Sequence, residues 1–301
     1  MKLDTHVHTH YSGYSTIKPL DRLMRESYNT PDGVYRLAKA RGMDLVTITD
    51  HDRIDGALTI ADRPDVIVGC EVTATFPRDH VRVHLGVIDI TEAQFAEITR
   101  LRGDVAELLP YLKRERIFVS LNHVASRVNG RITAAHIASL LPWIDAFEVL
   151  NGSRLFRQNR TATRLASAHA KIGLGGSDSH TMRGIGRAWV EAPHATTRRE
   201  FLQDLHAGRV RAGGTHGSVV TMASDVIRMT GNLYEEHGRK LIEGPWRWRR
   251  QLMAACLLAG IPLVTIPLVL SALHFVLEAR FNQSLLQDIS QRHDVRLPDW
   301  A

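Results

Sequence analysis

Short apolar runs rich in β-branched residues alternate with helix-like segments along most of the chain. The runs lie at residues 2–8, 43–49, 65–70, 82–88, 117–122, 145–150 and 172–177. Helix-boundary residues separate several of them, including Pro31 at a predicted helix start and the potential capping pairs Thr91/Gln94 and Thr197/Glu200. This alternation is typical of βα units and predicts an α/β barrel of seven strands. No crossover helix fits between the third and fourth runs, where the intervening residues are turn-like.

A second pattern occupies residues 252–277, which carry no formal charge and only one histidine, His274. As a helix rising about 1.5 Å per residue, this segment would exceed the roughly 30 Å of a bilayer core. Trp246 and Trp248 precede it among arginines, as at a membrane interface. A buried core helix kinked at its prolines is the alternative. We favour the membrane helix because core helices rarely stay apolar on every face.

Composition narrows the class of protein. The chain has 301 residues and only two cysteines, Cys70 and Cys256, which excludes a disulfide framework and a cysteine zinc site. The net charge is +6, of which residues 239–250 contribute +4. The positive charge that remains on the rest of the chain is small, which argues against a broad nucleic-acid-binding face. The first residues contain no apolar stretch of the kind a signal peptide needs.

These patterns divide the chain into four parts. We expect a catalytic barrel at 1–216, a linker and basic juxtamembrane segment at 217–250, a transmembrane helix at 251–277 and a C-terminal tail at 278–301. The basic residues before the apolar segment predict a single-pass membrane protein whose barrel lies on the cytoplasmic side, with the tail on the opposite side.

Polar groups able to bind metal or substrate are associated with every predicted strand. In chain order they are His6 and His8, Asp50 and His51, Glu71, His84, His123, Asn151, and Asp178 and His180. The carboxyl ends of parallel barrel strands converge on one rim, so these residues are expected to be neighbours. Imidazole and carboxylate ligands without thiolates suit Mn, Zn or Fe, and a carboxylate can bridge two ions. These residues therefore predict a site for more than one divalent metal ion, which is suited to hydrolysis of a phosphate ester.

The motifs that carry these residues resemble those of the PHP (polymerase and histidinol phosphatase) superfamily. They are HVHTHYS at 6–12, TDHD at 49–52, GCEVT at 69–73, HLG at 84–86, NHV at 122–124 and GGSDSH at 175–180. The resemblance covers about residues 1–215. It implies a distorted (βα)7 TIM-like barrel, two or three divalent metals and phosphoesterase activity.

The resemblance also implies a ligand set. His6, His8, Glu71 and Asp178 would surround one metal, and Glu71 would bridge to a second metal held by His84 and His123. His51 and His180 would serve a third. The aspartate that the family commonly places after the first motif is missing, since Gly13, Tyr14 and Ser15 follow Ser12. Either Tyr14 or His10 substitutes, or the site holds two metals and His51 and His180 act catalytically, contacting phosphate or protonating the leaving group.

Other residues are candidates for supporting roles. Asn151, Arg127 and Arg183 are predicted to bind substrate, because they follow strands on the same rim and suit phosphate recognition; Arg154 is a similar candidate. Asp4, Asp50 and Asp52 lie beside ligands and are positioned to orient imidazoles. Cys70 adjoins Glu71 and should face away from the metals.

The sequence therefore predicts a membrane-anchored phosphomonoesterase acting on a small phosphorylated substrate through a hydroxide that bridges the metals. One alternative is a nuclease or phosphodiesterase on short nucleic acid, which the small charge surplus does not favour. A metal-binding membrane sensor or scaffold without activity is another, prompted by the missing aspartate. Attack on a C–N bond is a further option for the same chemistry.

Overall fold

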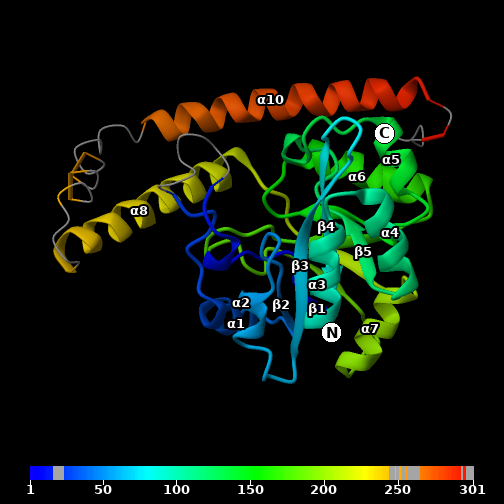
Figure 1. Cartoon of the computed structure of the whole chain (residues 1–301), viewed down its shortest axis with the longest axis horizontal. Coiled ribbons are helices and arrows are strands. Elements are labelled where there is room, and N and C mark those ends of the chain that lie inside the picture. The colour runs from blue at the N-terminus through cyan, green and yellow to red at the C-terminus, as the bar shows by residue number, and fades with distance from the viewer. Residues whose placement is uncertain are drawn as a thin grey trace.

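The computed structural model describes residues 1–15, 24–243, 248, 251–252, 255–256, 265–292 and 294–295. A curled sheet flanked by helices forms the main body, and two long helices extend from it (Figure 1). The strands are β1 Lys2–Leu3, β2 Val46–Ile48, β3 Val66–Thr75, β4 Arg82–Ile88, β5 Phe118–Leu121, β6 Ala146–Asn151, β7 Ile172–Gly176, β8 Ala188–Glu191 and β9 Arg211–Gly214. The helices are α1 Pro31–Ala40, α2 Asp55–Leu58, α3 Glu92–Leu101, α4 Val105–Arg114, α5 Ala134–Leu140, α6 Phe156–Ala168, α7 Arg198–His206, α8 Val219–Glu243 and α10 Thr265–Ser290, with short 3-10 turns η1 His10–Ser12 and η3 Arg127–Asn129.

The sheet curls so that its two edges approach the N-terminal segment. Six strands pair in the order β2-β3-β4-β5-β6-β7, while β1, β8 and β9 form a second sheet. Leu3 forms a bridge to Leu45 beside β2, and Val7 forms one to Ser179 beyond β7. The segment from residue 2 to residue 8 therefore lies between the edges and completes a barrel-like, mixed α/β fold. Each of the seven predicted strand segments contains a strand, although the first is paired as a regular strand only at Lys2–Leu3.

The direction of one strand differs from the all-parallel prediction. β4 runs antiparallel to both β3 and β5, because β3 continues to Thr75 and joins β4 through a tight connection. Glu71 consequently lies within β3, opposite Gly86, and not at the end of a strand. His84 lies near the start of β4, opposite Thr73. The start of the reversed strand β4 lies at the same rim as the ends of its neighbours. His84 is therefore at this rim because it lies near the start of an antiparallel strand, and not because it ends a parallel one.

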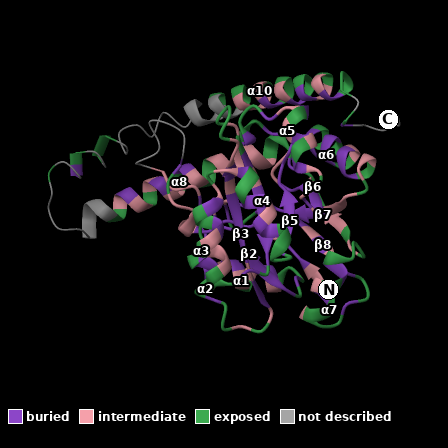
Figure 2. Ribbon diagram, turned by 45° about the vertical axis from the view of Figure 1, so that its right-hand side comes forward, coloured by how far each residue is buried: buried purple, intermediate pink, exposed green. Residues whose placement is uncertain are grey.

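Strand alternation separates the apolar core from the polar interior. Cys70, Val72 and Ala74 on β3 join the largest buried apolar cluster, which β3 to β6 form with helices α3 to α6 (Figure 2). Since successive side chains on a strand point to opposite faces, Glu71 is directed into the curl of the sheet. The prediction that Cys70 faces away from the site is confirmed by its place in this cluster.

Helix boundaries follow local chemistry. Pro31 begins α1 as predicted, and Thr91 and Gln94 form a full capping box at the start of α3. At α7 only half of the predicted box forms: Thr197 accepts from the Glu200 backbone, whereas the Glu200 carboxylate accepts from Thr196. Polar capping at each site satisfies backbone N–H groups that the first helical turn leaves unpaired.

The predicted membrane topology is wrong. None of the helices in the described part of the chain combines the length and apolar character that a bilayer crossing demands. Within the predicted span 251–277, residues 253–254 and 257–264 lie outside the described residues. From Thr265 the chain continues as α10 past the predicted end of the span, and Glu278, Asn282, Leu285 and Ile289 are buried. The predicted tail therefore contacts the barrel, although the sequence placed the two on opposite sides of a membrane.

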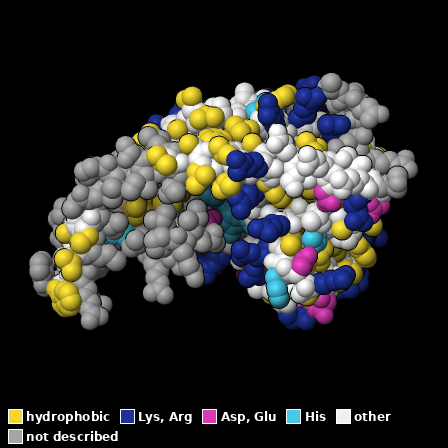
Figure 3. Space-filling model, turned by 90° about the horizontal axis from the view of Figure 1, so that it is seen from above, with side chains coloured by type: hydrophobic (Ala, Val, Ile, Leu, Met, Phe, Trp, Pro, Cys, Tyr) yellow, Lys and Arg dark blue, Asp and Glu magenta, His cyan; other side chains and the backbone are white. Residues whose placement is uncertain are grey.

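The outward face of α10 explains why the sequence resembled a membrane segment. Val269, Leu273 and Val276 are 65%, 53% and 48% exposed, and apolar side chains gather on the face that Figure 3 views. Apolar side chains are thus exposed on the first half of α10, whereas Glu278 and Asn282 face the barrel beside the buried Leu285 and Ile289. Exposed apolar side chains and buried polar ones depart from the usual pattern of a surface helix, which is why hydropathy alone misassigned this segment.

Candidate metal centre

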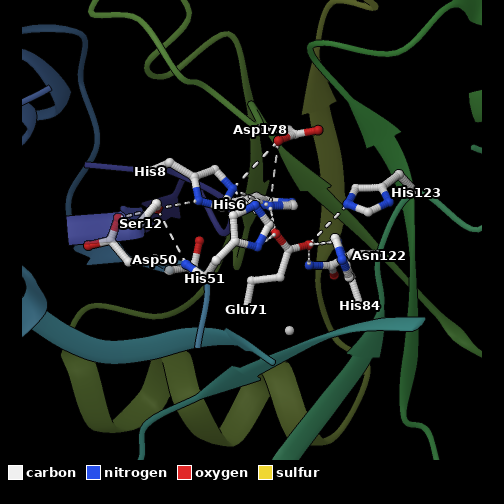
Figure 4. A network of polar contacts seen from close by, with 12 residues as sticks. His6, His8, Ser12, Asp50, His51, Glu71, His84, Asn122, His123 and Asp178 are labelled. Atoms are coloured by element: carbon white, nitrogen blue, oxygen red, sulfur yellow. Dashed lines mark hydrogen bonds and ion pairs between the residues drawn. The ribbon is translucent and has the colours of Figure 1, made fainter. Parts of the chain in front are cut away.

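All eight predicted metal ligands gather at one rim of the curled sheet. They are His6, His8, His51, Glu71, His84, His123, Asp178 and His180. Figure 4 labels each of them except His180 and shows Glu71 among them. Their side chains form overlapping groups of three whose nitrogen and oxygen atoms lie within 4.8 Å of one another. The structure therefore brings together groups separated by as many as 174 positions in sequence.

Glu71 faces a different set of imidazoles with each oxygen. Its Oε2 lies 3.2 Å from His6 Nε2, 3.4 Å from His8 Nε2 and 3.1 Å from His51 Nδ1. Its Oε1 lies 3.0 Å from His123 Nε2 and 3.5 Å from His84 Nδ1. Glu71 is fully buried, so this carboxylate is arranged to link two neighbouring ion positions.

Hydrogen bonds fix which ring nitrogens carry lone pairs. His6 Nδ1 donates to Glu148 Oε1 at 2.8 Å, because a carboxylate can only accept. Ser12 Oγ donates to Asp50 Oδ1, which leaves it to accept from His8 Nδ1. In the neutral imidazoles both Nε2 atoms then present lone pairs, and they face each other at 2.9 Å.

Such an arrangement requires a cation. The two Nε2 lone pairs converge with Glu71 Oε2 and with Asp178 Oδ1, which lies 3.7 Å from His6 Nε2 and 3.6 Å from His8 Nε2. Buried lone pairs and carboxylates repel one another unless protons or metal ions lie between them. Glu71 Oε2 and His84 Nδ1 are also buried without a hydrogen-bond partner. This donor set fits divalent metal ions of the kind that bind imidazole and carboxylate.

Glu148 is a supporting residue that the sequence reasoning missed. It is 2% exposed and, besides orienting His6, accepts from the His123 backbone at 2.9 Å and from Asn151 Nδ2 at 2.8 Å. Gly176 makes room for this contact, since a Cβ there would lie 2.5 Å from His6 Cβ and 2.9 Å from Glu148 Oε1. A lone carboxylate inside the apolar strand β6 was the signal available in the sequence.

Glu26 is the second missed residue, and it lies where the family's aspartate was sought. Its Oε2 is 3.1 Å from His51 Nε2 and 4.0 Å from His180 Nε2. The suggested substitutes are elsewhere: His10 Nδ1 donates to the Asn29 carbonyl, and Tyr14 is 45% exposed. No local motif marks Glu26, because it reaches the site from a loop 14 positions beyond Ser12.

In the metal-free site, buried carboxylates are paired with protonated imidazoles: burial opposes protonation of His6, but Glu71, Glu148 and Asp178 raise its pKa well above the usual range. Burial would raise the pKa of Glu71, but the surrounding imidazoles of His6, His84 and His51 hold it well below its usual range. Burial also works against ionisation of Glu26, yet the hydrogen bond with His51 lowers its pKa to about 2. Burial lowers the pKa of His180 to about 4, which keeps this imidazole neutral and able to ligate.

Backbone conformation at two candidate ligands is strained. His123 and Asp178 have φ angles of 30° and 50°, in the left-handed region that non-glycine residues seldom adopt. His123 and Asp178 each lie two positions beyond the end of a strand, β5 and β7, where the turn directs their side chains toward Glu71 or the His6–His8 pair. Strain of this kind persists where surrounding structure holds it, and it concentrates at functional sites.

The predicted substrate-binding residues occupy different positions. Asn151 is fully buried and donates to Glu148 and to Asp178 Oδ2, so it orients metal-site carboxylates and is not available to substrate. Arg127 is exposed on η3, and its backbone N–H is bound by Glu278. Arg183 is exposed and hydrogen-bonds Ser224 on α8. Arg154 is the arginine that contacts a ligand, with Nη2 at 3.1 Å from Asp178 Oδ2.

The three aspartates suggested as imidazole partners act differently. Asp50 reaches His8 through Ser12. Asp4 accepts backbone N–H groups from His6, Ser177 and Gly186, and burial raises its pKa to about 6. Asp52 pairs with Arg102 and caps the Thr73 backbone. Only Asp50 is therefore linked to an imidazole, and through a hydroxyl.

Comparisons with known proteins support the resemblance to the PHP superfamily. A family model described as PHP-associated matches residues 156–210. The uncharacterized protein MJ1587 of Methanocaldococcus jannaschii is 32% identical over 80 residues, which is 25% of this chain and 46% of that protein. The chain thus matches just under half the length of this curated relative.

Two solved structures share the fold. A two-domain protein from Bacteroides vulgatus, described as containing a predicted PHP-like metal-dependent phosphoesterase, has a TM-score of 0.53 at 15% identity, covering 71% of this chain and 64% of its own. PsfC from Pseudomonas syringae has a TM-score of 0.52 at 18% identity, covering 78% of this chain and 98% of its own. At these identities the similarity establishes the curled α/β architecture.

Proposed function

We propose that this chain is a metal-dependent hydrolase of the PHP superfamily that cleaves phosphomonoesters. The observation that carries the proposal is the buried ring of imidazole lone pairs and carboxylates around Glu71, which only cations can satisfy. The PHP-associated match and the shared fold support the same assignment.

We assign the ligands to three adjacent ion positions. His6, His8, Glu71 and Asp178 would hold one ion, and Glu71, His84 and His123 a second. His51 and His180 would hold a third ion together with Glu26. Because Glu26 supplies a carboxylate beside both imidazoles, its position favours a metal-binding role for them over the catalytic role without a third metal. Divalent ions at these positions would supply an activated water molecule and offset the charge of the phosphoryl oxygens.

Residues of the chain prepare the site for that chemistry. Glu148 and Ser12 hold His6 and His8 in the tautomers whose Nε2 atoms ligate. Arg154 balances the charge of Asp178 and is itself buried, so it stabilises the anionic ligand set. His51 and His180 are the more exposed imidazoles, at 20% and 26%, and they mark the side from which a substrate can approach.

The test uses the purified full-length chain, stripped of metal and reloaded with Mn or Zn. We expect hydrolysis of one or more members of a phosphomonoester panel, and loss of both turnover and bound metal in Glu71→Gln. The matched control is Glu97→Gln on α3, a partly exposed carboxylate paired with Arg100, which should behave as wild type. Stoichiometric metal without cleavage of any phosphomonoester contradicts the proposal, and cleavage of diesters alone would assign a phosphodiesterase instead.

A further inference from the structure

A cavity of about 950 Å³ adjoins the metal centre. Its lining includes Asn29 and Thr181, which connect it to the site: Asn29 Nδ2 donates to the His8 carbonyl at 3.0 Å, and Thr181 directly follows His180. The cavity and the proposed third ion position therefore share the same two loops.

Helix α8, which lies beyond the predicted catalytic barrel, forms the outer wall of this cavity. Arg228, Asn232, Glu235 and Arg239 line it at spacings of three and four residues, which places them on one face of the helix. Thr181 Oγ1 donates to Asp225 Oδ1 at 2.7 Å and anchors the start of α8 to the loop after β7. Arg25, beside Glu26, pairs with Glu236 at 3.5 Å and anchors the helix further along.

The arginines that line the cavity exceed its carboxylates. Arg25 pairs with Glu236 and Arg239 pairs with Glu235. Arg183 and Arg228 also line the cavity, and neither has a carboxylate within 4.0 Å among the residues that the structure describes. Two positive charges contributed by different elements are thus left for an anion. Guanidinium groups bind phosphate oxygens through paired N–H donors.

Arg183 and Arg228 are positioned to contact one part of a substrate while the ions contact another. Arg154, not Arg183 or Arg228, contacts the ligand Asp178, whereas Arg183 is directed to Ser224 on α8. Building on the proposed function, we infer that the cavity binds a second phosphoryl group, held by Arg183 and Arg228 while the first lies at the ions. The preferred substrates are small molecules that carry two phosphoryl groups.

Steady-state kinetics of the full-length chain on matched substrates tests this specificity. Pairs such as fructose 1,6-bisphosphate and fructose 6-phosphate differ by one phosphoryl group. One charge-assisted hydrogen bond contributes about 1.5–3 kcal/mol, so Arg183→Ala and Arg228→Ala should each raise KM for the bisphosphate roughly 10- to 100-fold. KM for the monophosphate should change less than about twofold, and kcat should be unchanged. Arg228→Lys should recover part of the loss.

The control variant is Arg100→Ala, an exposed arginine on α3 that does not line the cavity. It should leave KM for both substrates unchanged. Equal changes for mono- and bisphosphates in the Arg183 and Arg228 variants would overturn the inference while leaving the proposed function intact.

A second measurement does not depend on turnover. Calorimetric titration of the metal-free full-length chain with inorganic phosphate should show binding. The Arg183→Ala/Arg228→Ala double variant should lose this binding. Equal phosphate affinity in the wild type and the double variant, with both chains folded by circular dichroism, would refute the cavity assignment. If the wild type cleaves no ester but binds phosphate through these arginines, the proposed function fails and the anion site stands.

Discussion

The carboxylate of Glu278 on α10 links the C-terminal helix to the segment that carries His123. It is 2% exposed, and both its oxygens lie 3.1 Å from the Arg127 backbone N–H. Gln158 Nε2 donates to it at 2.7 Å and also donates to the Ala125 carbonyl. Removal of Glu278 therefore takes the side-chain acceptor from the Arg127 backbone N–H and one of two acceptors from the Gln158 amide.

That segment supports two proposed ligands at once. The Asn129 side chain donates to the His123 carbonyl at 3.2 Å and accepts from the His84 backbone at 2.9 Å. Because Arg127 and Asn129 belong to the same turn η3, loosening the Glu278 contact should loosen both His84 and His123. The ion position that these imidazoles share with Glu71 should weaken most.

The expected magnitude follows from the two lost hydrogen bonds. Each bond to a charged acceptor contributes about 1.5–3 kcal/mol, so Glu278→Ala should lower the free energy of unfolding by about 3–6 kcal/mol. Metal affinity at the affected position should fall about 10- to 100-fold, as for other residues that support ligands. Urea unfolding measures the first effect, and calorimetric titration of the stripped chain with Mn measures the second.

Asp288→Ala is the matched control from the same helix. Asp288 Oδ2 accepts one backbone N–H, that of Ala134 at the start of α5, at 2.6 Å. Its loss should cost about 0.5–2 kcal/mol, typical of a helix cap, and leave metal affinity unchanged. If both variants bind Mn equally well, Glu278 does not position the metal ligands.

Three further predictions concern the metal centre. Glu26→Gln should reduce the number of bound divalent ions by one in elemental analysis, and an unchanged ion count would show that Glu26 is not a ligand. Glu148→Gln should weaken Mn binding about 10-fold or more in calorimetry, since it no longer holds His6 by a charged acceptor; wild-type affinity would contradict this role. In the metal-free chain burial opposes protonation of His8, but the hydrogen bonds that the protonated imidazole donates to Asp178 and Glu71 raise its pKa from 6.5 to about 9. A raised pKa contributes stability that is present below pH 6.5 and is lost as pH rises through about 9. The metal-free Tm should therefore fall over this range, and bound metal should flatten the slope because it displaces the proton; identical slopes with and without metal would count against this account.

Local patterns in the sequence were sufficient to predict the strand segments and to pick out the eight candidate ligands that the fold brings together. Apolar β-branched runs gave seven of the nine strands in the described residues, missing β8 and β9, and alternation along a strand correctly placed Glu71 inside and Cys70 outside. The turn-like connection between the third and fourth runs was the sequence signal for the reversed direction of β4, but the apolar runs themselves do not carry it. Its pairing with β3 and β5 determines that direction, and pairing is not encoded in a single run.

The residues that the sequence reasoning missed depend on tertiary contacts. Glu26 contacts His51 from a loop that carries no recognisable motif. Glu148 contacts Nδ1 of His6, the ring nitrogen that is not the proposed metal ligand. The apolar segment before Glu278 was wrongly predicted to span a membrane for the same reason. Hydropathy reports the character of a helix, whereas the buried contacts of Glu278 with Gln158 and Arg127 decide where that helix lies.

Anomalous diffraction from crystals of the Mn-loaded full-length chain tests the central claim most directly. The account predicts manganese peaks on both sides of the Glu71 carboxylate, one beside His6 and His8 and one beside His84 and His123, and their loss in Glu71→Gln. Manganese bound only outside this cluster, or peaks that persist unchanged without the Glu71 carboxylate, would contradict it.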